Sequence, residues 1–344
     1  MPIVQSRRRF LTNAAFAGAA GIVGFGAWGK ALAAEPPPEV TRIRISEQPV
    51  TCVAPNWAAR ELLQSEGFTD VQYATWGKNT QNFMPEVLLS GEVDISLSFI
   101  ATDLIHIDAS APVVWLAGSH IGCIDLIGSE RVASVRDLKN KTVPIRHLRD
   151  PYHIFMSMFV AYVGLDPEKD INWLVLGYDP DPEEKLLADG KIDAFTAGPP
   201  YAPRLRKLGH VLLNTTTDRP WSQYLCCMIS STKSFIREHP IATKRALRAL
   251  LKATDLCAVE PERVARLIAE RDVPPTYDWR YDDILQGLKE IPYGQWREYD
   301  PEDAIRWYAL RMREVGMIKN TPQQIIAEHT DWRFLNELKR ELKA

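Results

Sequence analysis

Short apolar segments alternate along the chain with segments whose apolar positions have helical spacing. The apolar segments 93–99, 113–117 and 142–145 have the length of buried β-strands. Segments 80–90 and 151–163 have the longer amphipathic pattern of helices. Strands and helices that alternate in this way favour a parallel sheet covered by helices. The pattern therefore predicts an α/β protein.

Two segments, residues 87–95 and 186–194, repeat one pattern of leucine, glycine and aspartate at the same offsets. In each segment an amphipathic helix ends at a glycine and an apolar strand follows. Gly91 and Gly190 suit the left-handed conformation that closes a helix, because a Cβ is penalised there. Two copies of the pattern, each among alternating strands and helices, indicate two similar lobes.

Three motifs carry a resemblance to a known family: Leu88-Leu89-Ser90-Gly91-Glu92-Val93-Asp94, Asp137-Leu138-Lys139-Asn140-Lys141 and Leu186-Leu187-Ala188-Asp189-Gly190-Lys191-Ile192-Asp193-Ala194. In this order and spacing they resemble the substrate-binding proteins of nitrate, sulfonate and taurine-type ABC importers. The same superfamily includes binders of thiamine-pyrimidine precursors. The resemblance covers roughly residues 41 to 260, and Asn140 stands where the family usually has glycine. It implies the type II periplasmic binding-protein fold.

That fold consists of two doubly wound α/β lobes joined by a two-strand hinge. We expect residues 35–128 and 229–344 to form lobe one and residues 129–228 to form lobe two. The apolar segments 121–128 and 224–229 are the expected crossings between the lobes. The charged and aromatic C-terminal region predicts long helices that pack on lobe one.

The N-terminus has the features of an export signal. Residues 1–34 contain Ser6-Arg7-Arg8-Arg9-Phe10-Leu11, then a weakly apolar, glycine-rich run, then the small-residue pattern Ala31-Leu32-Ala33. This order resembles a twin-arginine signal peptide. The run lacks the roughly 18 strongly apolar residues that a membrane-spanning helix needs. We expect cleavage near Ala34, export to the periplasm and a soluble, monomeric mature protein.

Charge and cysteine usage exclude several function classes. The formal net charge is -3, so the chain has no basic field for nucleic acid. The five cysteines lack a metal-type spacing such as Cys-x-x-Cys, and we expect no metal or cofactor. Cys226 and Cys227 are neighbours in a predicted strand, so their side chains should point to opposite faces and not pair. Buried thiols that act as small hydrophobic groups are the default interpretation.

The sequence contains none of the common catalytic motifs, such as Gly-x-Ser-x-Gly, a phosphate-binding glycine-rich loop or His-Glu-x-x-His. The resemblance implies a solute-binding component that delivers a small, anionic organic molecule to an ABC permease and its ATPase. Two alternatives stay open: a periplasmic ligand sensor, and an enzyme similar to the pyrimidine synthases of the superfamily. Those synthases carry a longer cysteine-rich run where this chain has Leu225-Cys226-Cys227-Met228.

Doubly wound lobes bind ligands at the carboxyl ends of their strands, beside helix N-termini. The loops at these positions supply the candidate ligand-binding residues. In lobe one they are Asn56, Trp57, Trp76, Asn79, Ser98, Phe99 and His120, and in lobe two they are Arg146, Arg149, His153, Tyr178, Gly198 and Tyr201.

Three basic candidates surround a predicted helix start at Asp150-Pro151. Arg146, Arg149 and His153 are unfavourable for the helix dipole unless a negative group lies there. They either hold a carboxylate, sulfonate or phosphate ligand, or form a solvated surface with Asp150 as counter-ion.

The aromatic candidates and the histidine also have two interpretations each. Trp57 and Trp76 either sandwich a flat organic ligand or pack structurally, as most of the 10 tryptophans must. His120 follows a predicted strand, where it either bonds the ligand or is a satisfied structural histidine.

Overall fold

The computed structural model describes residues 35–48, 50–75, 84–177, 183–271 and 279–342. The candidates Trp76, Asn79 and Tyr178 lie outside these ranges. All the elements that follow belong to the unit from Pro37 to Ala344.

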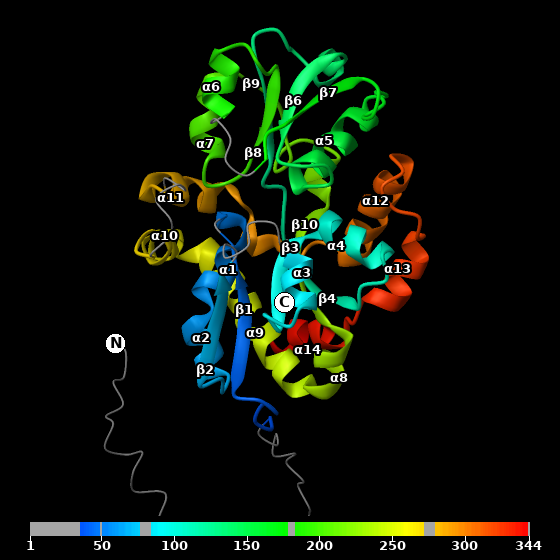
Figure 1. Ribbon diagram of the computed structural model, residues 1–344. Coiled ribbons are helices and arrows are strands. Elements are labelled where there is room, and N and C mark those ends of the chain that lie inside the picture. Colours follow the sequence, from blue (N-terminus) through cyan, green and yellow to red (C-terminus); the bar gives the residue numbers. More distant parts are fainter. Residues whose placement is uncertain (1–34, 49, 76–83, 178–182, 272–278, 343–344) are drawn as a thin grey trace, which may run out of the picture. The chain divides into compact units, whose positions relative to one another are not determined.

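Five strands form the sheet of lobe one, in the order β2-β1-β3-β10-β4 (Figure 1). Their bounds are β1 Arg42–Glu47, β2 Asp70–Thr75, β3 Ile95–Phe99, β4 Val113–Ile121 and β10 Leu225–Thr232. β1 pairs in parallel with β2 and β3, and β10 pairs antiparallel with β3 and β4. In β1, Ile43 and Ile45 are buried while Arg42 is exposed, which is the alternation that places one face on a core.

Lobe two contains two smaller groups of strands, β8-β5-β9 and β6-β7. Their bounds are β5 Asp125–Gly128, β6 Lys141–Ile145, β7 Ile171–Val175, β8 Ala194–Ala197 and β9 His210–Asn214. Asp193, just before β8, joins the groups: its N–H donates to the Thr142 carbonyl at 2.8 Å. Its carboxylate accepts from the Thr142 N–H at 2.9 Å.

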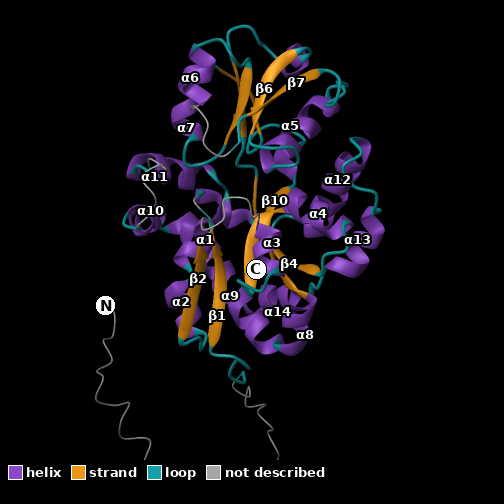
Figure 2. Ribbon diagram, viewed as in Figure 1, coloured by secondary structure: helices purple, strands orange, loops and turns teal. Residues whose placement is uncertain are grey.

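Helices flank both sets of strands (Figure 2). Their bounds are α1 Ala54–Ala58, α2 Arg60–Ser65, α3 Met84–Leu89, α4 Ile100–Asp108, α5 Pro151–Tyr162, α6 Glu183–Ala188, α7 Ala202–Leu205, α8 Lys233–Glu238, α9 Pro240–Val259, α10 Pro261–Ala269, α11 Tyr281–Glu290, α12 Pro301–Glu314, α13 Pro322–His329 and α14 Arg333–Glu341. Short 3-10 turns are η2 Thr51–Val53, η3 Val135–Leu138, η4 Arg206–Leu208, η5 Trp221–Gln223 and η7 Tyr293–Gln295. The predicted α/β alternation is confirmed.

The lobe boundaries differ from the predicted ones by a few residues. The predicted boundary after residue 128 places β5 in lobe one, but β5 pairs with β8 and β9 of lobe two. The predicted boundary after residue 228 places the first residues of β10 in lobe two, but they pair with β4 of lobe one. The chain therefore changes lobes at residues 122–124 and again at 215–224. The sequence could not locate these points, because apolar residues continue through both crossings.

The two crossing segments bond to each other and form the hinge. The Ile124 N–H donates to the Thr215 hydroxyl at 2.8 Å, and the Thr215 N–H donates to the Ile124 carbonyl at 2.9 Å. Gly122 has a φ of +62°, and a Cβ there would lie 2.5 Å from the Thr216 Cα. Only glycine permits this close approach of the two segments without displacement.

The C-terminal helices pack on lobe one, as predicted, through contacts such as those of α9 with α1 and α2. Two of them also reach lobe two, which the sequence did not predict. α12 packs against α5 as well as α4. Asp283 of α11 pairs with Arg204 of α7 at 3.4 Å.

Candidate functional site

The carboxyl ends of β1, β3 and β4 lie at one edge of the lobe-one sheet, which we call the lobe-one edge. Buried hydroxyls gather where the chain leaves these strands. Among the described residues, the side-chain oxygens of Thr51, Thr102 and Ser119 have no hydrogen-bond partner. Buried polar atoms without partners are uncommon in folded proteins, so these three mark an edge suited to a polar ligand.

Asn56 and Trp57 lie on α1, directly after this edge. Asn56 is fully buried, and its amide donates to the Ser46 carbonyl at 2.8 Å and the Ser46 hydroxyl at 3.0 Å. The Trp57 ring lies 4.6 Å from the Arg271 guanidinium and 5.5 Å from the Trp279 ring. Both side chains fix α1 to its surroundings.

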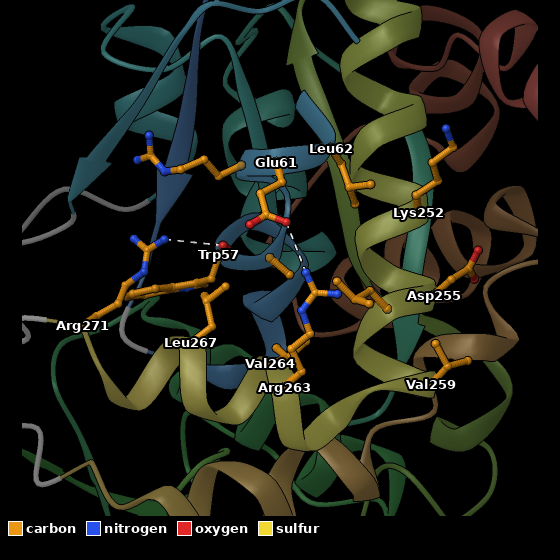
Figure 3. A pocket seen from close by; sticks show the side chains of 13 residues that line it. Trp57, Glu61, Leu62, Lys252, Asp255, Val259, Arg263, Val264, Leu267 and Arg271 are labelled. Atoms are coloured by element: carbon orange, nitrogen blue, oxygen red, sulfur yellow. Dashed lines mark hydrogen bonds and ion pairs between the residues drawn. The ribbon is translucent and has the colours of Figure 1, made fainter. Parts of the chain in front are cut away.

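Trp57 also lines a pocket of about 430 Å³ (Figure 3). The pocket lies between α1, α2, α9 and α10, with Leu62, Val264 and Leu267 among its apolar walls. Arg263 and Glu61 pair across its rim at 3.2 Å. Every lining residue belongs to lobe one, so a ligand bound here would not bridge the lobes.

Ser98 and Phe99 end β3 and have different surroundings. The Ser98 hydroxyl and the Trp115 Nε1–H both donate to the buried Asp103 carboxylate, at 2.8 and 2.7 Å. Burial raises the pKa of Asp103 to about 6. Phe99 stacks on Phe155 of α5 with ring centroids 4.1 Å apart, so it contacts lobe two.

His120 is fully buried at the end of β4. Its Nδ1 lies 3.0 Å from the Ile121 carbonyl oxygen and its Nε2 lies 3.0 Å from the Cys52 carbonyl oxygen. Carbonyl oxygens only accept, so both contacts are hydrogen bonds only when both ring nitrogens of His120 carry protons.

Cysteines surround His120. Cys52, His120 and Cys227 have ligand atoms within 4.8 Å of one another, and so do Cys123, Cys226 and Cys227. The prediction that Cys226 and Cys227 point to opposite faces is wrong, because the β10 register is irregular on both sides of Cys227. Contact with Cys123 is the main cause that raises the pKa of the Cys52 thiol, and burial raises the pKa of Cys226.

The carboxyl ends of β6, β7 and β8 form the corresponding lobe-two edge. A small pocket there is lined by Pro144, Ile145, Arg146, Tyr152, Leu176, Glu183, Phe195 and Thr196. Arg146 pairs with Glu183 at 3.5 Å and keeps about a third of its side chain exposed. Burial raises the pKa of Tyr152 far above its usual range, so its hydroxyl stays a hydrogen-bond donor.

The predicted helix start at Asp150-Pro151 is confirmed. The three basic candidates beside it have different surroundings. The Asp150 carboxylate accepts from the N–H groups of His153, at 2.6 Å, and Arg146, at 2.7 Å. This carboxylate already provides the negative charge that the start of α5 favours. Arg149 is exposed, and its N–H donates to Nδ1 of His153 at 2.9 Å. Desolvation lowers the pKa of His153. Arg146 alone of the three lines the pocket.

Gly198 and Tyr201 follow β8, where lobe two meets lobe one. A Cβ at Gly198 would lie 3.7 Å from the Tyr152 hydroxyl, so the backbone approaches the pocket closely. The Tyr201 hydroxyl accepts from the Trp279 Nε1–H at 3.1 Å, and Trp279 contacts Trp57 in turn. The Thr51 N–H donates to the Pro199 carbonyl at 3.4 Å. The two edges are thus in direct contact.

Sequence reasoning missed Tyr152, Glu183, Thr196 and Trp279. The first three join Arg146 at the lobe-two edge, and the fourth connects two predicted residues, Trp57 and Tyr201. Tyr152 follows the predicted Asp150-Pro151 start, which was a usable signal. Nothing in the local sequence of Trp279 indicates a contact across the lobes.

Two doubly wound α/β lobes with facing carboxyl edges and a two-segment hinge define a type II periplasmic binding-protein fold. The chain belongs to the NMT1-like family, whose model matches residues 36–271. No curated protein matches the sequence. Among the described residues, the helices are all too short or too polar to span a bilayer.

Solved structures share the fold at low sequence identity. The periplasmic nitrate-binding protein NrtA from Synechocystis PCC 6803 gives a TM-score of 0.72 at 16% identity, over 90% of each chain. The alkanesulfonate-binding protein SsuA from Xanthomonas axonopodis pv. citri gives 0.62 at 18%, over 84% of this chain and 96% of its own. The desulfurization enzyme DSZB gives 0.60 at 12%, over 88% and 99%.

Proposed function

We propose that the chain is the solute-binding component of an ABC importer. It captures a small organic molecule between the two edges and delivers it to a permease and its ATPase. The observation that carries the proposal is the contact of the two edges through Thr51 and Pro199, beside buried hydroxyls that have no partner among the described residues. Export by the signal-like residues 1–34 to the periplasm, as a monomer, fits this role.

The lobe-two edge favours a ligand with an anionic group. Arg146 supplies a guanidinium, and the hydroxyls of Tyr152 and Thr196 line the same pocket. Arg146 and Glu183 are 3.5 Å apart, beyond a good charge-assisted hydrogen bond, so a carboxylate or sulfonate of the ligand competes with Glu183 for the guanidinium. Two structural relatives are named as binders of nitrate and alkanesulfonate, which are also anions.

The first experiment identifies the ligand and tests the role of Arg146. Native mass spectrometry of protein purified from the periplasm is combined with thermal-shift screening of small sulfonates and carboxylates. For a compound that binds, calorimetry compares wild type with Arg146→Ala. Loss of a charge-assisted contact should weaken binding about ten- to hundredfold.

Arg136→Ala is the matched control, because Arg136 of η3 is an exposed lobe-two arginine outside the pocket. It should bind like wild type. Equal affinities for Arg146→Ala and Arg136→Ala would remove the anion assignment and leave the aromatic residues as the main contacts.

The second experiment tests capture between the lobes. Small-angle scattering with and without a compound proven to bind should give a smaller radius of gyration with ligand. An unchanged radius would contradict closure around the ligand. Chemical turnover of the bound compound would support the enzyme alternative, for which DSZB is a precedent in this fold. Normal uptake of the bound compound by cells that lack this protein would favour the sensor alternative.

A further inference from the structure

Four of the five cysteines, which we call the thiol cluster, converge at the lobe-one edge. Cys52 lies in η2 after β1, Cys123 follows β4, and Cys226 and Cys227 lie at the start of β10. The Sγ atoms of Cys123, Cys226 and Cys227 all lie within 4.8 Å of one another, and Cys52 lies within the same distance of Cys227. Three chain segments that are distant in sequence therefore bring these thiols close together.

The spacing of the sulfur atoms fits ligands of one metal ion. The Sγ atoms of Cys123 and Cys226 are 3.7 Å apart. With metal–sulfur bonds of about 2.3 Å, two ligands of a tetrahedral ion lie about 3.8 Å apart. A disulfide would require a sulfur–sulfur distance of about 2.05 Å. All five cysteines are free thiols.

Irregular backbone conformations at Cys123 and Cys227 orient their side chains toward the thiol cluster. Adjacent residues of a regular strand point to opposite faces, but register shifts flank Cys227, so it and Cys226 reach the same cluster. Cys123 has a φ of +108°, which is strained for a residue with a Cβ. Such strain persists only where the surroundings hold it, and it concentrates at functional sites. Hydrophobic packing of small thiols would not require either feature.

The cluster is buried on one side and partly accessible on the other. Cys226 and Cys227 are 1% and 3% exposed, whereas Cys52 and Cys123 are partly exposed. A His120 nitrogen lies within 4.8 Å of the Cys52 and Cys227 thiols, but both of its ring nitrogens face backbone carbonyls, so the proposed ligands are thiols.

We propose that Cys123, Cys226 and Cys227 bind one thiolate-preferring metal ion, Zn²⁺ or Cu⁺. Binding forms metal–sulfur bonds, and each coordinating thiol releases its proton to solvent, with no change of oxidation state. This site goes beyond the proposed import function, because it does not involve Arg146 or the lobe-two pocket.

The test is metal binding by the intact, reduced protein in the absence of oxygen. Zn²⁺ and Cu⁺ are titrated separately against chromophoric chelators, and Co²⁺ serves as a spectroscopic probe of tetrahedral thiolate coordination. We expect one equivalent of Zn²⁺ or Cu⁺ per chain and the intense visible bands of Co²⁺ bound to thiolates. The two titrations decide which ion the site prefers.

Cys226→Ser and Cys227→Ser should weaken binding at least as much as loss of a supporting residue around a metal, about 10- to 100-fold. Cys257→Ser is the matched control, because Cys257 is a buried cysteine of α9 outside the cluster. It should bind metal like wild type. Circular dichroism checks folding, and Cys123→Ser, at a less buried position, replaces any variant that fails to fold.

Three results would overturn the proposal: no stoichiometric binding of either ion, equal losses in Cys257→Ser and the cluster variants, or isolation of a Cys123–Cys226 disulfide whose reduced form binds no metal. Thermal-shift screening of sulfonates and carboxylates is done on both metal-free and metal-loaded protein, so that solute binding is measured independently of metal binding. If the protein binds no metal, solute binding can still be tested, and if it binds no solute, metal binding can still be tested.

Discussion

The repeated glycine–aspartate segments of the two lobes make the same local structure. Gly91 and Gly190 close their helices with φ values of +76° and +66°. Asp94 and Asp193 then each exchange two hydrogen bonds with a neighbouring strand, through Arg44 in lobe one and Thr142 in lobe two. Each aspartate also pairs with an arginine, Arg44 or Arg131.

The carboxyl edges of the same lobes differ completely. The lobe-one edge carries thiols, a buried histidine and hydroxyls without partners among the described residues. The lobe-two edge carries Arg146, Glu183 and Tyr152. The repeat thus concerns the scaffold, while the edges have diverged. A repeated motif is informative about architecture, and the ligand chemistry has to be determined separately for each lobe.

Replacing the repeated aspartates should give the largest effect and an unequal one. Asp94 is 7% exposed and accepts from the N–H and Nε of Arg44, whose side chain is 38% exposed, so Asp94→Ala leaves partly buried donors unpaired. We expect a loss of about 3 kcal/mol, because a charged group loses several hydrogen bonds that solvent replaces only in part. Asp193→Ala should cost less, about 1–2 kcal/mol, because Arg131 is half exposed. Urea unfolding measures both. Equal losses would contradict the difference in burial.

The buried Asp103 gives lobe one a pH dependence. Its folded-state pKa of about 6 lies above the ordinary value, so the folded protein binds this proton more tightly than the unfolded chain. Its contribution is therefore full below about pH 4 and is lost as pH rises through about 6, by about 3 kcal/mol in total.

Unfolding free energies of wild type and Asp103→Asn, measured from pH 4 to pH 8, test this sign. The difference between the unfolding free energies of wild type and Asp103→Asn should change across that pH range. Parallel profiles would show that Asp103 does not titrate there. Asp303→Asn, with an exposed side chain, serves as control.

The hinge should be more sensitive to a methyl group than the end of a helix. Gly122→Ala combines a positive φ with a Cβ 2.5 Å from the Thr216 backbone, so we expect a cost of about 2 kcal/mol. Gly91→Ala has a similar φ but no neighbour within 4 Å, and should cost about 1 kcal/mol. Thermal unfolding of both variants measures the two losses of stability. A larger loss for Gly91→Ala than for Gly122→Ala would contradict the close approach of Gly122 to Thr216.

The smallest expected effect is the ion pair between α7 and α11. Arg204 and Asp283 are about a quarter and a fifth exposed and lie 3.4 Å apart. A double-mutant cycle of Arg204→Ala and Asp283→Ala should give a coupling of less than about 1 kcal/mol. A coupling of several kcal/mol would mean that this pair holds the lobes together.

Much of the scaffold could be predicted from the chain. The strands at 95–99, 113–121 and 141–145 and the helix from Pro151 follow from local patterns, because a buried strand or an amphipathic helix constrains each of its residues. The crossing points could not be located, since an apolar residue suits either sheet. The Asp150 cap was predictable because its bonds are to residues three and four positions away.

The candidate site was predicted only in part. Arg146 was placed correctly beside a helix start, but its partner Glu183 comes from a different strand-to-helix connection. For Trp57 the sequence left two interpretations open, ligand contact or structural packing, and its ring packs against Arg271 and Trp279 at the wall of a lobe-one pocket. Pairs of this kind depend on how helices from the C-terminal region fold back, which no local pattern encodes.

The alternation of strands and helices and the helix-closing glycines could be predicted from the sequence, because each depends on residues close in the chain. The family could be predicted from the order and spacing of its motifs. Which side chains meet across the fold depends on how the elements pack. Cys52, Cys123, Cys226 and Cys227 have no metal-type spacing, yet an irregular strand and three converging segments bring their sulfur atoms together. The spacing of two residues in the sequence limits the distance between their side chains only when both lie in one helix or strand. For residues in different elements, the packing of those elements sets the distance.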